Sequence, residues 1–343
     1  MSQPEGAVLE PRFVGSQPHI KSKAEIELEA QAFSAAAKLE HRQRMTGTIG
    51  TYRVLQELGD GGNSAVYLVE AMQGIHRGVL FALKVFLRIS DLTRRDRFDV
   101  EIKFLQSCDH PSIMRVFDHD EHYVNISGVS RTFPFVVAEY LPSTLRSSMQ
   151  SGLSIIEKTV FTLQLLSGLA YLAANNPQII HRDIKPENIF VKGRSALLGD
   201  FGLLKAGDGL DPSIEYHISE SNGIRYPRHY PTPDLIEYCK ERVDPKPLSV
   251  KSDVFQLGLV IAELYTGNVP LAHRKVPFDP VIITAIHAVG GSQGAAITSI
   301  IQTMLEIDTL KRPAAADLFD PWEGIFLQLA NVSQQLDGKV FGR

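Results

Sequence analysis

The feature that most constrains this sequence is the stretch HRDIKPEN at residues 181–188, followed by DFG at residues 200–202. Both lie in loop-forming sequence after an apolar segment with helical periodicity, residues 155–175. Together they supply a carboxylate to accept a hydroxyl proton, a cation near a transferring group and oxygen ligands for Mg²⁺. The sequence therefore predicts a phosphoryl-transfer site formed by Asp183, Lys185, Asn188 and Asp200.

A glycine-rich stretch, LGDGGNSAVYL at residues 58–68, is the candidate phosphate-binding loop. Gly59 and Gly61 lie on a predicted turn between strands, where the missing side chains let backbone amides approach phosphate oxygens. A hairpin that binds nothing is the alternative. The strand-loop-strand setting differs from a dinucleotide-binding fingerprint, which opens a helix.

Lys84 is a charged residue inside an apolar predicted strand, FALKVF. Such a lysine is costly to bury unless its ammonium meets a carboxylate or a phosphate. Glu101, on the predicted helix that follows, is the natural carboxylate candidate. A lysine that reaches solvent from an edge strand is the alternative.

The periodicity of the chain changes at Pro142. Before it, the pattern predicts strands and one prominent helix, at residues 51–69 (two strands), 79–87, 92–106 (the helix) and 133–141. After it, the pattern predicts long amphipathic helices at residues 155–175, 252–265 and 295–305. The predicted fold class is α+β, with a small β-rich lobe that has one key helix and a larger, mainly helical lobe.

The predicted organisation has five parts: a flexible N-terminus at 1–20, an amphipathic helical extension at 21–45, the small lobe at 50–141, the large lobe at 142–328 and a C-terminal tail at 329–343. In the extension, Ile26, Ala30, Phe33 and Ala37 stand at helical spacing. Docking on the main body, recruitment of a regulatory partner and a solvated helix all stay open.

Composition excludes several classes of function. The 343 residues carry a formal net charge of −4, so no basic field indicates a nucleic-acid partner. Cys108 and Cys239 lack a CxxC spacing, which argues against a disulfide framework or a zinc site. No apolar run approaches the ~20 residues that cross a bilayer, and the N-terminus lacks the pattern of a secretion signal. The expected setting is cytoplasmic, with no membrane span.

Across residues 50–325 the motifs resemble, in family order, those of the eukaryotic-type serine/threonine protein kinases. The resemblance implies a protein-kinase-like two-lobed fold that uses ATP and Mg²⁺. It also implies transfer of the γ-phosphate to a serine or threonine hydroxyl of a protein substrate, together with autophosphorylation. Lys185 supports this class, because tyrosine kinases usually carry an arginine and alanines in the corresponding stretch.

The resemblance implies a role for each matched position of the nucleotide site. Gly59, Gly61 and Val66 would cover the nucleotide, and Lys84 would bind its α- and β-phosphates. Glu101 would pair with Lys84. The remaining positions would surround the adenine, with a small gatekeeper residue behind it: Ala82, the carbonyl of Glu139, the amide of Leu141, and the gatekeeper Ala138.

In the catalytic loop, the resemblance makes Asp183 the catalytic base and Lys185 the residue that neutralises the γ-phosphate. Asn188 and Asp200 would be the magnesium ligands. Further along the chain, Asp253 would anchor the catalytic loop.

The chain departs from the family pattern in two places. Ser64 replaces the third glycine of the loop, and Ile224 replaces the threonine that normally touches the catalytic aspartate and lysine. The acidic residue that closes the activation segment, Asp234, comes about four positions late. We still predict that it pairs with Arg312. Because this segment is the platform for the substrate peptide, we expect an unusual choice of substrate.

Arg182 precedes the catalytic aspartate, which in the family allows an activation-loop phosphate to order the segment. Ser213, Ser219 and Ser221 are the candidate acceptors. Two other functions stay open. One is a pseudokinase that binds ATP as a scaffold, and the other is a small-molecule phosphotransferase with the same two-lobed plan.

Overall fold

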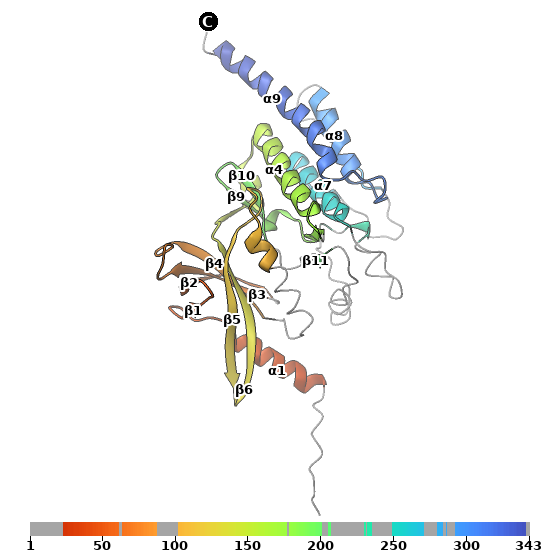
Figure 1. Ribbon diagram of the computed structural model, residues 1–343. Helices are drawn as coiled ribbons and strands as arrows, with labels where there is room; N and C mark the ends of the chain where they lie inside the picture. Colours follow the sequence, from red (N-terminus) through yellow and green to blue (C-terminus); the bar gives the residue numbers. More distant parts are fainter. Residues whose placement is uncertain are drawn as a thin grey trace, which may run out of the picture.

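The structure is a computed structural model that describes residues 23–61, 64–87, 102–176, 178–200, 205–206, 230, 232–234, 249–270, 280–283, 286 and 292–340. The chain forms a strand-rich lobe and a helical lobe, which lie one above the other in Figure 1. This arrangement confirms the predicted α+β fold class.

The small lobe is a six-stranded antiparallel sheet with the order β1-β2-β3-β4-β6-β5. Its strands are β1 (Arg44–Thr46), β2 (Thr51–Gly61), β3 (Ser64–Ala71), β4 (Leu80–Phe86), β5 (Val116–Ile126) and β6 (Val129–Glu139). The sequence predicted β2, β3, β4 and the second half of β6. It missed β5, whose polar run DHDEH hides the alternation of a strand. Of the predicted helix at 92–106, the structure describes residues 102–107 as helical and does not describe the rest.

The two faces of this sheet have different environments. Alternate residues of β3 and β4, such as Tyr67 and Leu83, are fully buried in the core of the small lobe. The residues between them, including Val66 and Lys84, are only partly buried on the opposite face. Because side chains alternate across a strand, one face of the sheet packs against the core and the other stays partly exposed.

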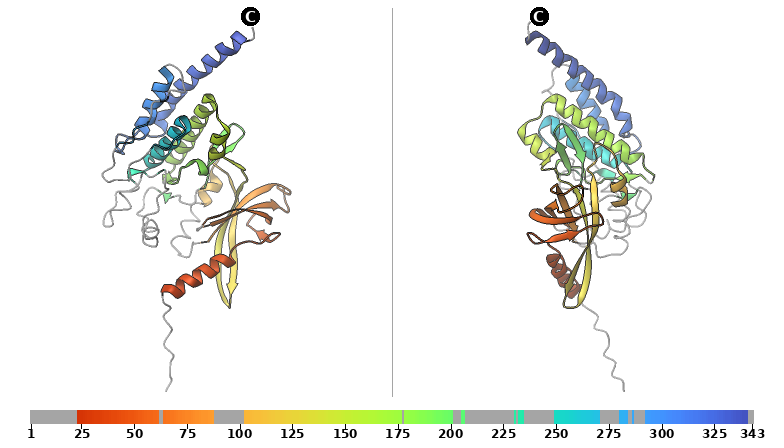
Figure 2. Two further views of the ribbon diagram at one scale, coloured as in Figure 1. Left: turned by 180° about the vertical axis from the view of Figure 1, so that it is seen from behind. Right: turned by 60° about the vertical axis from the view of Figure 1, so that its left-hand side comes forward.

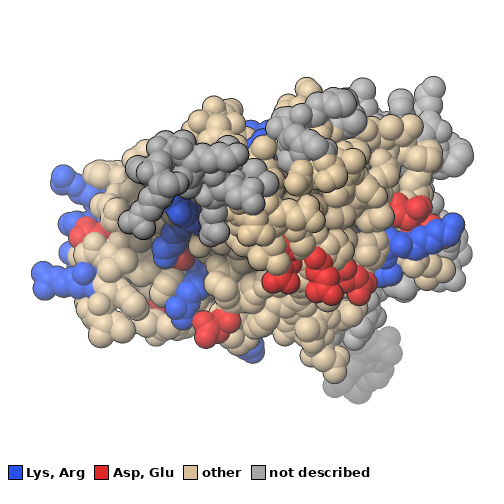
Figure 3. Space-filling view, turned by 90° about the horizontal axis from the view of Figure 1, so that it is seen from above, with Lys and Arg blue, Asp and Glu red and all other residues tan. Residues whose placement is uncertain are grey.

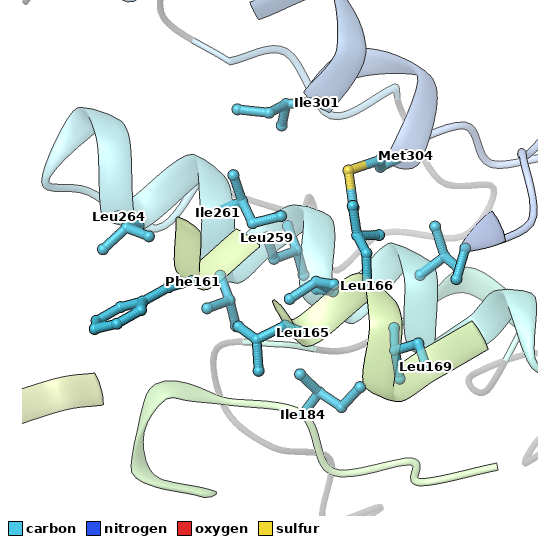
Figure 4. Close-up of a cluster of buried hydrophobic side chains, with 14 of the residues drawn as sticks. Phe161, Leu165, Leu166, Leu169, Ile184, Leu259, Ile261, Leu264, Ile301 and Met304 are labelled. Atoms are coloured by element: carbon cyan, nitrogen blue, oxygen red, sulfur yellow. The ribbon is translucent and has the colours of Figure 1, made fainter. Parts of the chain in front are cut away.

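The large lobe is built on helices α3 (Leu145–Ser151), α4 (Ile155–Ala173), α7 (Lys251–Thr266), α8 (Ser292–Met304) and α9 (Phe319–Val340), with short 3-10 turns at Pro186–Asn188 and Ala316–Leu318. From Ser252 to Tyr265 every residue of α7 is buried. A helix that is buried on all sides forms the centre of a core. Figure 4 shows apolar side chains converging there from three helices: Phe161, Leu165, Leu166 and Leu169 of α4, Leu259, Ile261 and Leu264 of α7, and Ile301 and Met304 of α8.

Among the described residues, one helix, α4, is long and apolar enough to cross a membrane. It packs inside the large lobe against α7, α9 and β10, as the core helix of a globular lobe does. At the other end of this lobe, α9 runs through residue 329, where the sequence analysis placed the start of a tail.

Short strands in the large lobe flank the HRDIKPEN and DFG stretches. β9 (Ile189–Lys192) pairs with β10 (Ser195–Leu198) and with β7 (Ser143–Thr144), and β8 (Ile179–Ile180) pairs with β11 (Lys205–Ala206). The HRDIKPEN stretch therefore leaves β8 and enters β9. DFG follows β10, and of its three residues the structure describes Asp200.

Charged side chains do not collect into one region on the face drawn in Figure 3. Among the described residues visible there, Lys and Arg stand in separate groups with Asp and Glu near them.

The N-terminal extension docks on the small lobe, beside the β5–β6 hairpin (Figures 1 and 2). Its helix, α1 (Lys23–Ala36), is shorter than the predicted 21–45. Phe33 is 2% exposed and lies under the guanidinium of Arg131, 4.4 Å from the ring centroid. Arg131 also pairs with Glu29 at 3.0 Å.

After the helix ends, the chain forms hydrogen bonds to strands of the sheet. Leu39 N donates to the Tyr67 hydroxyl at 3.0 Å, and Arg42 N donates to Val54 O at 2.8 Å. The chain then adds β1 to the edge of β2. Residues 44–45, which the sequence analysis assigned to the helix, are therefore strand.

Phe33→Ala tests whether this docking stabilises the lobe. Emptying a buried phenylalanine site costs about 3 kcal/mol or more, so the urea midpoint should fall markedly. Leu28→Ala on the same helix is the matched control, because Leu28 is 66% exposed and its removal should change the midpoint little. Equal midpoints for the two variants would show that α1 only rests on the surface.

Candidate active site

The register of the β9–β10 hairpin brings two predicted site residues together. Ile189 pairs with Leu198, so Asn188 just before β9 and Gly199 just after β10 lie at the same end of the hairpin. Gly199 N donates to Asn188 O at 3.0 Å. Asp200 follows directly, at a φ of 55°. The antiparallel hairpin therefore joins residues that are 12 positions apart in the sequence.

Asp183 is the centre of a compact polar cluster. Its Oδ2 accepts hydrogen bonds from Lys185 Nζ and Asn188 Nδ2, both at 2.8 Å, and its backbone oxygen accepts a second one from the Asn188 amide at 2.9 Å. Its side chain is 14% exposed. The structure thus brings three of the predicted residues into direct contact, with the carboxylate held in one orientation.

Side chains of α7 accept hydrogen bonds from the backbone of the catalytic loop. Asp253 is 1% exposed, and its two oxygens accept hydrogen bonds from His181 N at 2.7 Å and Arg182 N at 2.8 Å. These contacts confirm the predicted anchoring role of Asp253. Gln256, one turn later, accepts from Ile184 N at 3.0 Å.

The DFG side of the site is tied to the same loop. His181 Nε2 lies 3.0 Å from Gly199 O. Because a carbonyl oxygen only accepts, the proton of this contact belongs to Nε2. The ring therefore connects the loop of Asp183 to the residue before Asp200.

Lys84 crosses the space between the lobes to form an ion pair with Asp200. Sheet register places Gly59 opposite Val66 and Val66 opposite Lys84, so the three stand in one row across β2, β3 and β4. Residues directly opposite each other share a face of the sheet. The predicted nucleotide-covering residues and the lysine therefore line the face that looks toward Asp200. Gly61 is the last residue of β2 and pairs with Ser64, the first residue of β3.

Asp200 carries the charge that a metal ligand needs. Burial acts to raise the pKa of its carboxyl, but the adjacent Lys84 ammonium outweighs burial and lowers this pKa below its usual range. Asn188 donates through its amide nitrogen, which leaves its amide oxygen as an acceptor. One carboxylate and one amide oxygen, flanked by Lys84 and Lys185, fit a magnesium ion with a polyphosphate that completes its shell.

Further along the same face lie the residues predicted to surround adenine. Ala82 pairs directly with Ala138, and Ala138 is 5% exposed. The chain then passes through Glu139, whose carboxylate pairs with Lys192, to Leu141, which is 8% exposed. Both Ala82 and Ala138 have small side chains.

Several predicted residues lie outside the described part of the chain. They include Glu101, the three serines Ser213, Ser219 and Ser221, and Ile224. The predicted Lys84–Glu101 pair and the choice of phosphorylation site therefore stay predictions.

Asp234 does pair with Arg312, which confirms the prediction made despite the altered spacing. Asp234 Oδ1 lies 3.2 Å from the Arg312 guanidinium, which is completely buried. Arg312 also donates to the Lys251 and Glu306 carbonyl oxygens, each at 2.8 Å. The extra residues in this segment therefore leave its closing ion pair intact.

Sequence reasoning missed one group beside the catalytic loop. Arg146 contacts Glu187, Glu263 and Tyr230, four residues from four separate parts of the chain. Glu187 belongs to the HRDIKPEN stretch, so its position was a usable signal. The other three carry no motif of their own.

The geometry just described agrees with comparisons to known proteins. A family model described as protein kinase domain matches residues 52–322. This chain belongs to the protein kinase family.

Two relatives illustrate the likeness of this kinase domain. It is 28% identical over 289 residues to the serine/threonine-protein kinase pkn2 of Myxococcus xanthus, which covers 78% of this chain and 31% of that protein. It is 30% identical over 226 residues to the serine/threonine-protein kinase PrkC of Bacillus subtilis, which covers 64% of this chain and 31% of that protein. The chain thus spans about a third of the length of these relatives.

Asp253→Asn tests the anchor of the catalytic loop in this kinase domain. An asparagine presents an NH₂ group to one of two buried N–H donors, which leaves a donor unsatisfied and costs about 2 kcal/mol. We expect a lower urea midpoint and faster hydrogen exchange at the amides of His181 and Arg182.

The matched control is Asp317→Asn. Asp317 is exposed and accepts one backbone hydrogen bond, from Ala314 N at 2.9 Å. Its midpoint should stay near that of the parent. Exchange at His181 and Arg182 that is unchanged in Asp253→Asn would refute the anchoring role.

Proposed function

We propose that this chain is a serine/threonine protein kinase that uses Mg-ATP to phosphorylate a hydroxyl of a protein substrate and also phosphorylates itself. The observation that carries the proposal is a pair of neighbouring polar clusters, one within the loop of Asp183 and one that joins the two lobes. Asp183 is bound to Lys185 and Asn188, and Asp200 is bound to Lys84. No residue type that this chemistry needs is missing from the matched motifs.

The roles of the residues follow from their charges and contacts. Asp183 orients the acceptor hydroxyl and takes its proton while the hydroxyl oxygen bonds to the transferred phosphorus. Lys185, 2.8 Å from Asp183, offsets negative charge on the transferring group. Bound Mg-ATP supplies the phosphoryl group, whose bond to the ADP oxygen breaks with the electron pair on ADP.

The nucleotide is held by the remaining predicted residues. Asn188 and Asp200 would hold the metal ion, and Lys84 would hold the phosphates. With nucleotide bound, the Lys84 ammonium would contact phosphate oxygens as well as Asp200. Gly59, Gly61 and Val66 would cover the nucleotide.

Two alternatives make different predictions. A pseudokinase would bind ATP with magnesium and transfer nothing. A small-molecule phosphotransferase would phosphorylate a metabolite and leave proteins unlabelled. The matched motifs favour the protein kinase, since Lys185 and Asp253 are both present and make the contacts described above.

Asp183→Asn is the direct test. The asparagine keeps the size and loses the proton acceptor, so transfer should fall about 10²- to 10⁴-fold while nucleotide binding persists. The measurement is transfer of labelled γ-phosphate to the chain itself and to a mixture of generic acceptor proteins, with analysis of the labelled amino acids.

Asp317→Asn, at the surface of the large lobe, serves as the matched control and should transfer phosphate like the parent. Label on serine or threonine that disappears in Asp183→Asn supports the proposal. A folded parent chain that binds Mg-ATP and labels no protein contradicts it and favours a pseudokinase.

The gatekeeper position gives a second test. Ala138 is buried opposite Ala82, so little side-chain volume closes the space behind the adenine site. Ala138→Met should raise the inhibitory concentration of bulky-substituted ATP-competitive compounds at least tenfold. The KM for ATP in the same variant is the internal control and should change little. Unchanged inhibition would show that no such pocket opens behind Ala138.

A further inference from the structure

The group around Arg146 is a polar cluster that the proposed chemistry does not use. Arg146 is the second residue of α3, and its guanidinium donates to three partners. Nε donates to Glu187 at 2.8 Å, one terminal nitrogen to Glu263 at 2.6 Å and the other to the Tyr230 hydroxyl at 2.9 Å. The Tyr230 hydroxyl in turn donates to Glu263. We call these four residues the Arg146 cluster.

The cluster is buried at one end and open at the other. The Glu263 side chain is 8% exposed, that of Arg146 is 31% exposed and that of Glu187 is 48% exposed. One guanidinium therefore serves two carboxylates at the rim of the catalytic loop. Without it, the same place would hold two carboxylates and one phenol, which is an environment that binds a cation.

The cluster lies close to where a substrate must lie. Glu187 lies four residues after Asp183 in the same loop. Because an extended chain spans at most ~3.5 Å per residue, the Cα atoms of these two residues are at most about 14 Å apart. A peptide whose hydroxyl reaches Asp183 can place a side chain two to four positions away at this distance. Gln256 also joins the backbone oxygens of Arg182 and Tyr230, at 3.0 and 3.2 Å, which links the cluster to the catalytic loop.

We propose that Arg146 determines peptide specificity by filling, from within the chain, the acidic site of Glu187 and Glu263 that would otherwise bind a basic side chain of the substrate. This inference rests on the proposed protein kinase function. The enzyme then gains nothing from an arginine near the acceptor hydroxyl, and the positive charge of Arg146 disfavours one.

Arg146→Gln and Arg146→Ala test the proposal. Glutamine keeps a hydrogen-bond donor for the buried Glu263, so Arg146→Gln should stay folded. Alanine removes both the donor and the charge. The measurement is kcat/KM for peptides in which an arginine or an alanine stands at each of the four positions on either side of the acceptor. For the parent enzyme the arginine-to-alanine ratio should be one or less at every position. In both variants it should rise at least tenfold at one or two positions.

Two further proteins separate specificity from stability. The first is the double variant Arg146→Gln with Glu187→Gln. Because it lacks one carboxylate of the acidic site, it should lose most of the increase in the arginine-to-alanine ratio of kcat/KM. Arg53→Gln is the matched control: Arg53 also pairs with a glutamate, Glu70, but stands in the small lobe. Its ratios should equal those of the parent.

The outcomes are distinguishable. If the parent phosphorylates peptides and folded Arg146→Gln keeps the parent ratios at all positions, Arg146 is only a structural clamp and the inference is wrong. If the gain survives in the double variant, the acidic site lies elsewhere and the inference is again wrong. If the parent labels neither itself nor any peptide, the proposed function fails, and this inference fails with it.

Discussion

The buried carboxylate of Asp253 is the interaction on which the rest of the site depends. A carboxylate removed from water is costly unless hydrogen bonds replace its hydration. Here two backbone amides of the catalytic loop do so, and the position in the first turn of α7 adds the favourable field of a helix N-terminus. Because α7 is buried along its length, this anchor is as rigid as the core of the large lobe. The catalytic loop is thereby fixed to a helix that is buried from Ser252 to Tyr265.

This anchor also explains a strained backbone. Arg182 has a φ of 67°, a conformation that costs a non-glycine residue about 1–3 kcal/mol. Both of its backbone groups are held by α7, the N–H by Asp253 and the oxygen by Gln256. Asp253 and Gln256 stand three residues apart, on one face of the helix. The helix thus stabilises the positive φ of Arg182, the residue that precedes Asp183.

The sequence was informative wherever a contact is local or belongs to an ordered motif. Asp183, Lys185 and Asn188 lie within one short loop, so their contact could be predicted. The sequence also predicted β3 and β4 as strands, although only the register of the sheet shows which residues share a face with Lys84. Such inferences depend on spacing along the chain, which the sequence displays directly.

Contacts between distant segments were harder to predict. Lys84 pairs with Asp200, 116 positions away, and the spacing of the two residues does not indicate this contact. The predicted partner Glu101 lies outside the described residues, so that pair stays a prediction. Arg146 meets Glu263 at a separation of 117 residues, and no periodicity indicates that meeting. The strand β5 was missed because its polar residues obscure the alternation. In each case the packing of complete elements decides the contact, and that information is spread over the whole chain.

The N-terminal extension changes where the folded unit begins. The family match starts at residue 52, yet Phe33, Ala37 and Leu39 belong to the small-lobe core, and β1 covers the free edge of β2. A fragment trimmed to the family boundary would expose unpaired backbone groups along that edge beside an emptied apolar hollow. Exposed edges of this kind pair with other chains. For this protein, a fragment that keeps the edge of β2 covered must therefore include residues 23–51, which precede the matched domain.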